Sequence, residues 1–367
     1  MPQLSQQVTL GLPLKSWLLN GLCAATLAAL AAGCASAHKE PAHYTFFPPA
    51  PDEPRVQYLT AFSSDLELGR SQSFADYITG RPSGASPLIK PYGLGLYGGK
   101  LYVCDTMSSR IQVFDLVKRR SRDFAPRGEG RLQTPINITI DADGTRYVTD
   151  TGRDQVLIFG KDDNYVGAIG TSGEMKPTDV AVTPERLYVT DVKGHGVRVY
   201  SKADRKLLFK IPREAKPGQG GLYSPTNLAV DRQGHLLVSD LGGFSVQVFD
   251  LDGKYLRTIG QQGVAPGLFA RPKGIAVDRE GHIYVVDAAT QVVQVFDADG
   301  HLLMYFGAAG SSTEGELYLP AAVKVDYDDV GLFQKKAAPG FKIQYLILVT
   351  SQFGAHKVTV YGFGSRK

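Results

Sequence analysis

The chain has 367 residues, of which 43% are hydrophobic and 10% aromatic, together with 41 glycines and 21 prolines. This composition indicates a turn-rich globular protein that is long enough to bury a sizeable core. The net charge of +4 is dispersed over 40 basic and 36 acidic residues, which argues against the concentrated basic surface of a nucleic-acid-binding protein.

The first 33 residues predict a signal peptide. Lys15 is their single basic residue, and an uncharged run from Ser16 to Ala32 leads into small residues. The run is too short for a permanent membrane span. Its ending, "LAALAAGC", resembles the bacterial lipobox, which implies that Cys34 is lipidated and becomes the first residue of the mature chain. Ordinary cleavage after "ASA" is the alternative.

Residues 34–54 predict a tether. Five prolines lie between Pro41 and Pro54, which favours an extended chain rather than a packed element. The resemblance to lipoproteins, with Ala35 after the cysteine, implies attachment to the outer membrane of the cell envelope.

Residues 55–367 predict one repeat domain. Each of six copies reads as strand, tight turn, strand, Asp or Ser, loop and strand, and each opens with a proline. The spacing between successive prolines is 44, 42, 48, 47 and 48 residues, as expected for four-stranded antiparallel propeller blades. The prolines are Pro91, Pro135, Pro177, Pro225, Pro272 and Pro320.

The sixth copy ends after its third strand, at "KVTVYGFG". Near the other end, "RVQYLTAF" (Arg55 to Phe62) is a strand without a blade. We expect it to be the outer strand of the sixth blade, which would join both ends of the domain in one sheet and remove an exposed edge.

The repeated pattern resembles the NHL repeat. It reads Pro, then "GIAVD" or "NLAVD", then "YVVD" or "YVTD", then "VQVF". Members of that family are six-bladed β-propellers, so the resemblance implies an all-β fold of six blades. Asp105, Asp150, Asp191, Asp240 and Asp287 recur at the end of each second strand, where a turn-capping role is expected.

Three polar side chains follow the opening prolines of successive innermost strands, at Asn137, Asp179 and Asn227. Oxygen ligands that converge on one rim suit Ca²⁺ or Mg²⁺. Proteins similar to gluconolactonases hold a metal at this position, but the other blades offer Gly93, Gly274 and Ala322. The alternative is that the three residues only hydrogen-bond the local backbone.

Loops that follow the second strands should surround the same rim, and they carry the candidate partner-binding residues. These residues are Arg110, Arg153, Lys193, His195, Phe244 and His356. The loop from Asp326 to Lys342 lies at the opposite end of the ring and is a second candidate surface. Because the tether should join the start of "RVQYLTAF", we expect the membrane on that opposite side.

Two functions of different class follow. The first is a monomeric, membrane-tethered scaffold that binds a protein or another macromolecule. The second is a metal-dependent hydrolase or lyase, similar to lactonases, that works at the rim. The scaffold is favoured because no cluster of catalytic residues is recognisable, the lone Cys104 is expected to fill the core, and no cofactor motif is present.

Overall fold

The computed structural model describes residues 43–69, 78, 87–213 and 220–366. Cys34 and the predicted signal peptide therefore lie outside the described residues. The propeller forms a compact unit from Tyr44 to Lys367. No helix within the described ranges is long and apolar enough to cross a membrane.

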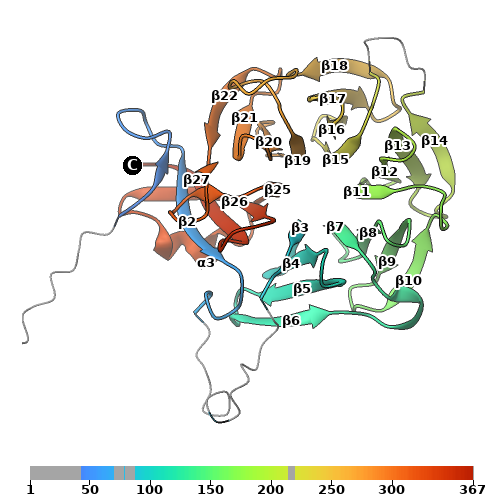
Figure 1. Cartoon of the computed structure of the whole chain (residues 1–367), viewed down its shortest axis with the longest axis horizontal. Coiled ribbons are helices and arrows are strands. Elements are labelled where there is room, and N and C mark those ends of the chain that lie inside the picture. Colours follow the sequence, from blue (N-terminus) through green and yellow to red (C-terminus); the bar gives the residue numbers. More distant parts are fainter. Residues whose placement is uncertain (1–42, 70–77, 79–86, 214–219, 367) are drawn as a thin grey trace, which may run out of the picture. The chain divides into compact units, whose positions relative to one another are not determined.

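Six antiparallel sheets surround one axis, as Figure 1 shows. The first three blades are β3 (Pro91–Tyr97), β4 (Lys100–Asp105), β5 (Arg110–Asp115) and β6 (Arg120–Phe124); β7 (Pro135–Ile140), β8 (Arg146–Asp150), β9 (Gln155–Phe159) and β10 (Tyr165–Ile169); and β11 (Pro177–Val182), β12 (Arg186–Asp191), β13 (Gly196–Ser201) and β14 (Leu207–Ile211). Blades four and five are β15 (Pro225–Val230), β16 (His235–Asp240), β17 (Ser245–Asp250) and β18 (Tyr255–Ile259); and β19 (Pro272–Val277), β20 (Ile283–Asp287), β21 (Val292–Phe296) and β22 (Leu302–Phe306). The six-bladed architecture expected from the repeat is confirmed.

Blade six contains both ends of the unit. Its strands are β25 (Pro320–Asp326), β26 (Phe341–Ser351), β27 (Val358–Arg366), β2 (Val56–Phe62) and β1 (Phe46–Phe47). The expected closing strand is confirmed, because β2 pairs with β27 from Val56 opposite Phe363 to Phe62 opposite Val358. The innermost strands of blades six and one, β25 and β3, are also in contact, so the ring is closed.

The segment before β2 differs from the expected extended tether. Phe46 and Phe47 pair with Gln57 and Val56 as a fifth strand of blade six. Their aromatic rings explain why this segment packs, because Phe46 contacts Phe341 and Phe47 contacts Tyr361.

The β1–β2 hairpin also changes where the chain reaches the propeller. The Thr45 hydroxyl donates a hydrogen bond to Glu314 in the loop before blade six. The described chain therefore reaches β2 through β1 on the outer edge of the blade, and the side on which the membrane lies stays a prediction.

Short elements complete the unit. They are the parallel pair β23 (Ala308–Ala309) and β24 (Glu316–Leu317), the 3-10 helices η1 (Gly128–Gly130) and η2 (Gln334–Lys336), and the helix α3 (Val330–Phe333). The last two occupy the long loop of blade six.

The core lies between neighbouring blades. The aromatic residue near the end of each third strand is buried, as with Phe114, Phe159 and Phe249. Cys104 is also fully buried, as expected, and burial raises the pKa of its thiol. These positions stabilise the ring and leave the strand ends to carry binding residues.

The ring has two faces with different loops. We call the face where the innermost strands start the mouth face; it also carries the loops after the second and fourth strands. We call the other the turn face; it carries the tight turns between first and second strands, together with α3 and η2.

Candidate functional site

The recurring aspartates hold the loops of the mouth face together. The Asp150 carboxylate accepts hydrogen bonds from the backbone N–H groups of Gln133, Thr134, Gly152 and Arg153. Equivalent bonds to backbone N–H groups occur at Asp105, Asp191, Asp240 and Asp287. The expected turn-capping role is confirmed, so these carboxylates are not available as a catalytic set.

The structure brings together two of the three candidate metal ligands. The Asn227 side-chain amide donates to Asp179 Oδ2 over 3.3 Å, and the Leu228 N–H donates to the same oxygen over 3.1 Å. Asp179 Oδ1 accepts from Val180 N–H, and Asn137 Oδ1 accepts from Ile138 N–H. The Asp179 carboxylate thus links β11 to β15 of the next blade, whereas Asn137 Oδ1 bonds the backbone of its own strand.

This arrangement does not fit a cation. All three residues are buried, and among the described residues Asn227 Oδ1 is the only one of their side-chain oxygens without a hydrogen-bond partner. Burial raises the pKa of Asp179, while the charge of Lys324 lowers it. A divalent ion needs about six oxygen ligands, and here most of the oxygens already accept N–H groups.

The glycines at the equivalent positions explain why no further ligand is offered. A Cβ at Gly93 would lie 2.0 Å from Asn137 Oδ1, and one at Gly274 would lie 2.5 Å from the Ala322 Cα atom. Neighbouring innermost strands approach too closely there for a side chain. The alternative that these residues bond the local backbone describes the Oδ1 atoms of Asn137 and Asp179, while Asp179 Oδ2 bonds the neighbouring blade.

Arg110 is not an exposed partner-binding residue. Its side chain is only 9% exposed and pairs with Asp123 over 2.7 Å at the start of β5. Arg153 is half-buried and donates to the carbonyl oxygens of Glu129 and Arg131. Both arginines support loops of the mouth face, so substitutions there would disturb the structure of these loops.

The other four candidates lie on mouth-face loops, as expected. Lys193 is exposed and donates to the carbonyl of Gly173. His195 and Phe244 occupy the last loop position before a third strand, with φ of 50° and 52°. His356 is partly buried, and within the described part of the chain its Nδ1 atom has no hydrogen-bond partner.

A group of cations and aromatic rings lies where blades five, six and one meet on the mouth face. Lys273 lies over the Tyr92 ring at 5.0 Å, and Lys90 and Lys357 lie 5.5 and 6.0 Å from the Phe353 ring centre. Together with Arg271, we call these six residues the rim cluster. Sequence reasoning missed it because its members lie beside Pro91, beside Pro272 and in the loop after β26, and they converge only in the closed ring.

The charges of the rim cluster act on one another. Lys273 is 6% exposed, and burial, assisted by Arg271 and Lys90, lowers its pKa to about 8. Lys357 donates to the carbonyl oxygens of Ile89 and Gln352, and burial lowers the pKa of its amine too. The cluster concentrates positive charge that an anionic group would relieve.

Exposed apolar side chains lie on the same face. Tyr223 is 65% exposed and Phe353 45% exposed, and Met107, Val264 and Tyr318 are exposed on other mouth-face loops. Large exposed apolar residues beside cations are typical of surfaces that bind proteins. The mouth face therefore carries both cations and exposed apolar side chains.

Comparison with known proteins agrees with the fold. A family model described as "6-bladed beta-propeller" matches residues 225–306. A Bacteroides thetaiotaomicron protein of unknown function is similar at a TM-score of 0.57, with 17% identity over 84% of this chain and 75% of that one.

Two enzymes share the architecture at low identity. A gluconolactonase from Xanthomonas campestris has a TM-score of 0.55, with 15% identity over 89% of this chain and 99% of that one. A virginiamycin B lyase from Staphylococcus aureus, in complex with quinupristin, has a TM-score of 0.54, with 14% identity over 76% of this chain and 97% of that one. Likeness at this level concerns the fold alone.

Proposed function

We propose that the protein is a lipid-anchored, NHL-type β-propeller of the bacterial cell envelope that binds an acidic protein partner through its mouth face. The rim cluster carries the proposal, because it gathers four cations and two aromatic rings on one part of that face. Attachment through Cys34 to the outer membrane, after removal of a signal peptide, rests on the sequence motif.

The partner should present carboxylates beside apolar side chains. Lys90 and Arg271 supply positive charge on the mouth face, and Phe353 and Tyr318 are exposed nearby, with ring centres 6.3 Å apart. Pairing of opposite charges favours encounter and orientation, and aromatic contacts supply most of the binding free energy in such surfaces.

A hydrolase or lyase function at the rim has less support. The shared architecture of the gluconolactonase and the lyase allows it. However, Asn137, Asp179 and Asn227 are buried, and among the described residues every side-chain oxygen of the three except Asn227 Oδ1 accepts a hydrogen bond, so the catalytic metal that such a function was expected to use lacks a ligand set.

The test is crosslinking of the full-length protein in its own membranes, followed by purification and identification of the crosslinked proteins. A Lys90→Glu, Arg271→Glu variant should recover at least tenfold less of the main partner than the parent. Lys335→Glu reverses one exposed charge on the turn face and is the control, with recovery unchanged. Equal recovery with the rim variant would show that the partner binds elsewhere.

A further inference from the structure

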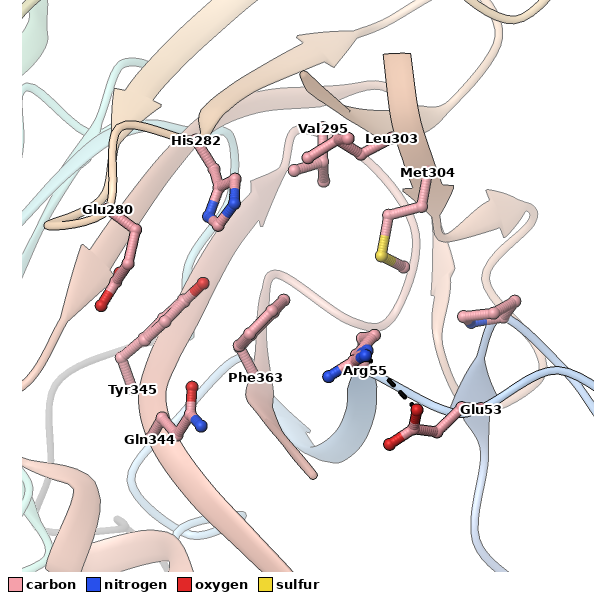
Figure 2. Close-up of a pocket in the computed structure, with 11 residues that line it drawn as sticks. Glu53, Arg55, Glu280, His282, Val295, Leu303, Met304, Gln344, Tyr345 and Phe363 are labelled. Carbon is pink, nitrogen blue, oxygen red and sulfur yellow. Dashed lines mark hydrogen bonds and ion pairs between the residues drawn. The ribbon is translucent and has the colours of Figure 1, made fainter. Parts of the chain in front are cut away.

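A pocket of about 510 Å³ opens on the turn face, between blades five and six and beside the β1–β2 hairpin (Figure 2). Blade five contributes the turn after β19 and the start of β22. Blade six contributes β26, β27 and the segment before β2. The lining includes Arg55, His282, Met304, Gln344, Tyr345 and Phe363.

His282 is held in one orientation within this lining. Its Nδ1 atom lies 2.8 Å from Asp278 Oδ2, and its backbone N–H donates to Asp278 Oδ1. A carboxylate accepts hydrogen bonds, so Nδ1 carries the proton in the neutral ring and Nε2 is the acceptor. Figure 2 shows the ring directed toward Tyr345 and the pocket.

Two tyrosines from different blades hold the Asp278 carboxylate in place. The hydroxyl of Tyr345 donates to Asp278 Oδ2 over 2.9 Å, and that of Tyr284 lies 3.2 Å from the same oxygen. The two hydroxyl oxygens are 2.7 Å apart. Burial raises the pKa of both tyrosines, so they remain donors. This buried network pre-organises His282.

The Asp–His contact alone would not mark a site, because the same turn recurs. His235 Nδ1 lies 2.8 Å from Asp231, and His301 Nδ1 lies 3.0 Å from Asp297. The acidic residues beside His282 and His301 belong to these turns and by themselves indicate no metal. The turn of blade five differs because Asp278 also binds the two tyrosines and His282 lines a pocket.

The rest of the lining is mainly apolar. Tyr345 and Phe363 stack in parallel, with ring centres 4.7 Å apart and an angle of 5° between their planes. Met304, Leu303 and Val295 form the opposite side in Figure 2. The polar lining residues besides His282 are Glu280 and Gln344, and Arg55, which pairs with Glu53 over 3.3 Å. Apolar walls with a few fixed polar groups are typical of small-molecule sites of this volume.

We propose that this pocket binds a small, flat, mostly apolar molecule that carries a hydroxyl group, with the hydroxyl donating to His282 Nε2. The aromatic and thioether side chains suit the faces of a planar ring. Arg55 and Gln344 supply donors for a carbonyl or carboxylate at the other end of the ligand. Loss of the ligand hydroxyl would leave a fixed acceptor unpaired, so the site selects for it.

The probes are 4-hydroxybenzamide and benzamide, which differ only in the hydroxyl group. Binding to the full-length protein in lipid nanodiscs is followed by saturation-transfer NMR, with empty nanodiscs subtracted. We expect 4-hydroxybenzamide to bind at least tenfold more tightly than benzamide. Equal signals for the two probes, or no binding of 4-hydroxybenzamide at millimolar concentration, would overturn the proposal.

Three variants locate the bound probe. His282→Phe keeps an aromatic ring but removes the acceptor, and should weaken 4-hydroxybenzamide at least tenfold. Met304→Trp should block both probes by filling the pocket. His235→Phe changes the matching turn of blade four and should leave binding unchanged. Parent-like binding by the His282 variant, or an equal loss in the His235 variant, would refute the assignment; circular dichroism establishes that each variant is folded.

Discussion

Lys273 gives the rim cluster a dependence on pH. Its pKa of about 8 lies below the ordinary value of 10.5, because its amine is buried beside Arg271 and Lys90. Between pH 8 and 10.5 the unfolded chain therefore holds one proton more than the folded chain at this residue, and its contribution to stability rises with pH over that interval. The charge that it offers a partner falls as pH rises through 8.

Binding of an acidic peptide should follow this loss of charge. A fluorescent peptide of six glutamates should bind the parent protein about two- to fivefold more weakly at pH 9 than at pH 7, since one cation is lost. Lys273→Gln should bind at both pH values with the weaker affinity. Fluorescence anisotropy at constant ionic strength measures the affinity of the parent and of the variant for the peptide. An affinity of the parent that does not change between pH 7 and 9 would contradict the assignment of the titration to Lys273.

At the scale of the element, β2 contributes more to the stability of the ring than its seven residues suggest. Val56 and Phe62 are at most 1% exposed, and the Phe62 ring contacts Phe114 of blade one edge-to-face, with ring centres 5.2 Å apart. The strand thus completes blade six through β27 and also packs against its neighbour. Its removal would expose two sheet edges at one joint.

Phe62→Ala should lower the free energy of unfolding by about 3–5 kcal/mol, because it leaves a cavity between two blades. Leu208→Ala on the outer strand β14 is the matched control: its side chain is 50% exposed, and the expected change is within about 0.5 kcal/mol. Denaturant unfolding monitored by circular dichroism measures both variants. A similar, small effect in the two variants would show that the β2 joint does not limit the stability of the ring.

The elements that could be predicted are those with a local signal. The prolines, the alternation of apolar residues and the turn aspartates define the strands one blade at a time, and "RVQYLTAF" could be placed because blade six lacked a strand. β1 was missed because Phe46 and Phe47 lie among prolines, and their packing depends on Phe341 and Tyr361, some 300 residues later.

The candidate sites were less predictable, because they too depend on contacts between residues that are far apart in the chain. Position in the repeat placed Asn137, Asp179 and Asn227 together but could not show that the oxygens of Asn137 and Asp179 bond backbone N–H groups. In the sequence, His235, His282 and His301 each follow a glycine in a tight turn, so His282 cannot be told from the other two there. Only the tertiary contacts of Tyr345 and Phe363 distinguish it. The repeated sequence predicts the blades. The contacts that distinguish one blade from another form only where two blades meet.

At the scale of the whole molecule, the proposed anchor and the ring are separate parts with separate roles. Replacement of Cys34 by Ser should abolish lipid attachment and leave the propeller folded, because the described unit begins at Tyr44. The variant should fail to incorporate labelled fatty acid and should be uncleaved or released from the membrane fraction. Fractionation and labelling like those of the parent would refute the lipoprotein assignment.

The β1–β2 hairpin has a mechanical consequence. A pull on the chain before Tyr44 acts first on β1, which is held by two residue pairs with β2, by the Thr45–Glu314 hydrogen bond and by the ring contacts of Phe46 and Phe47. β2 is held to β27 by six residue pairs and by its buried side chains, so the load meets much greater resistance there. Detachment of β1 would release roughly 40 Å of chain. The β1–β2 hairpin would then open under tension while the ring stays closed.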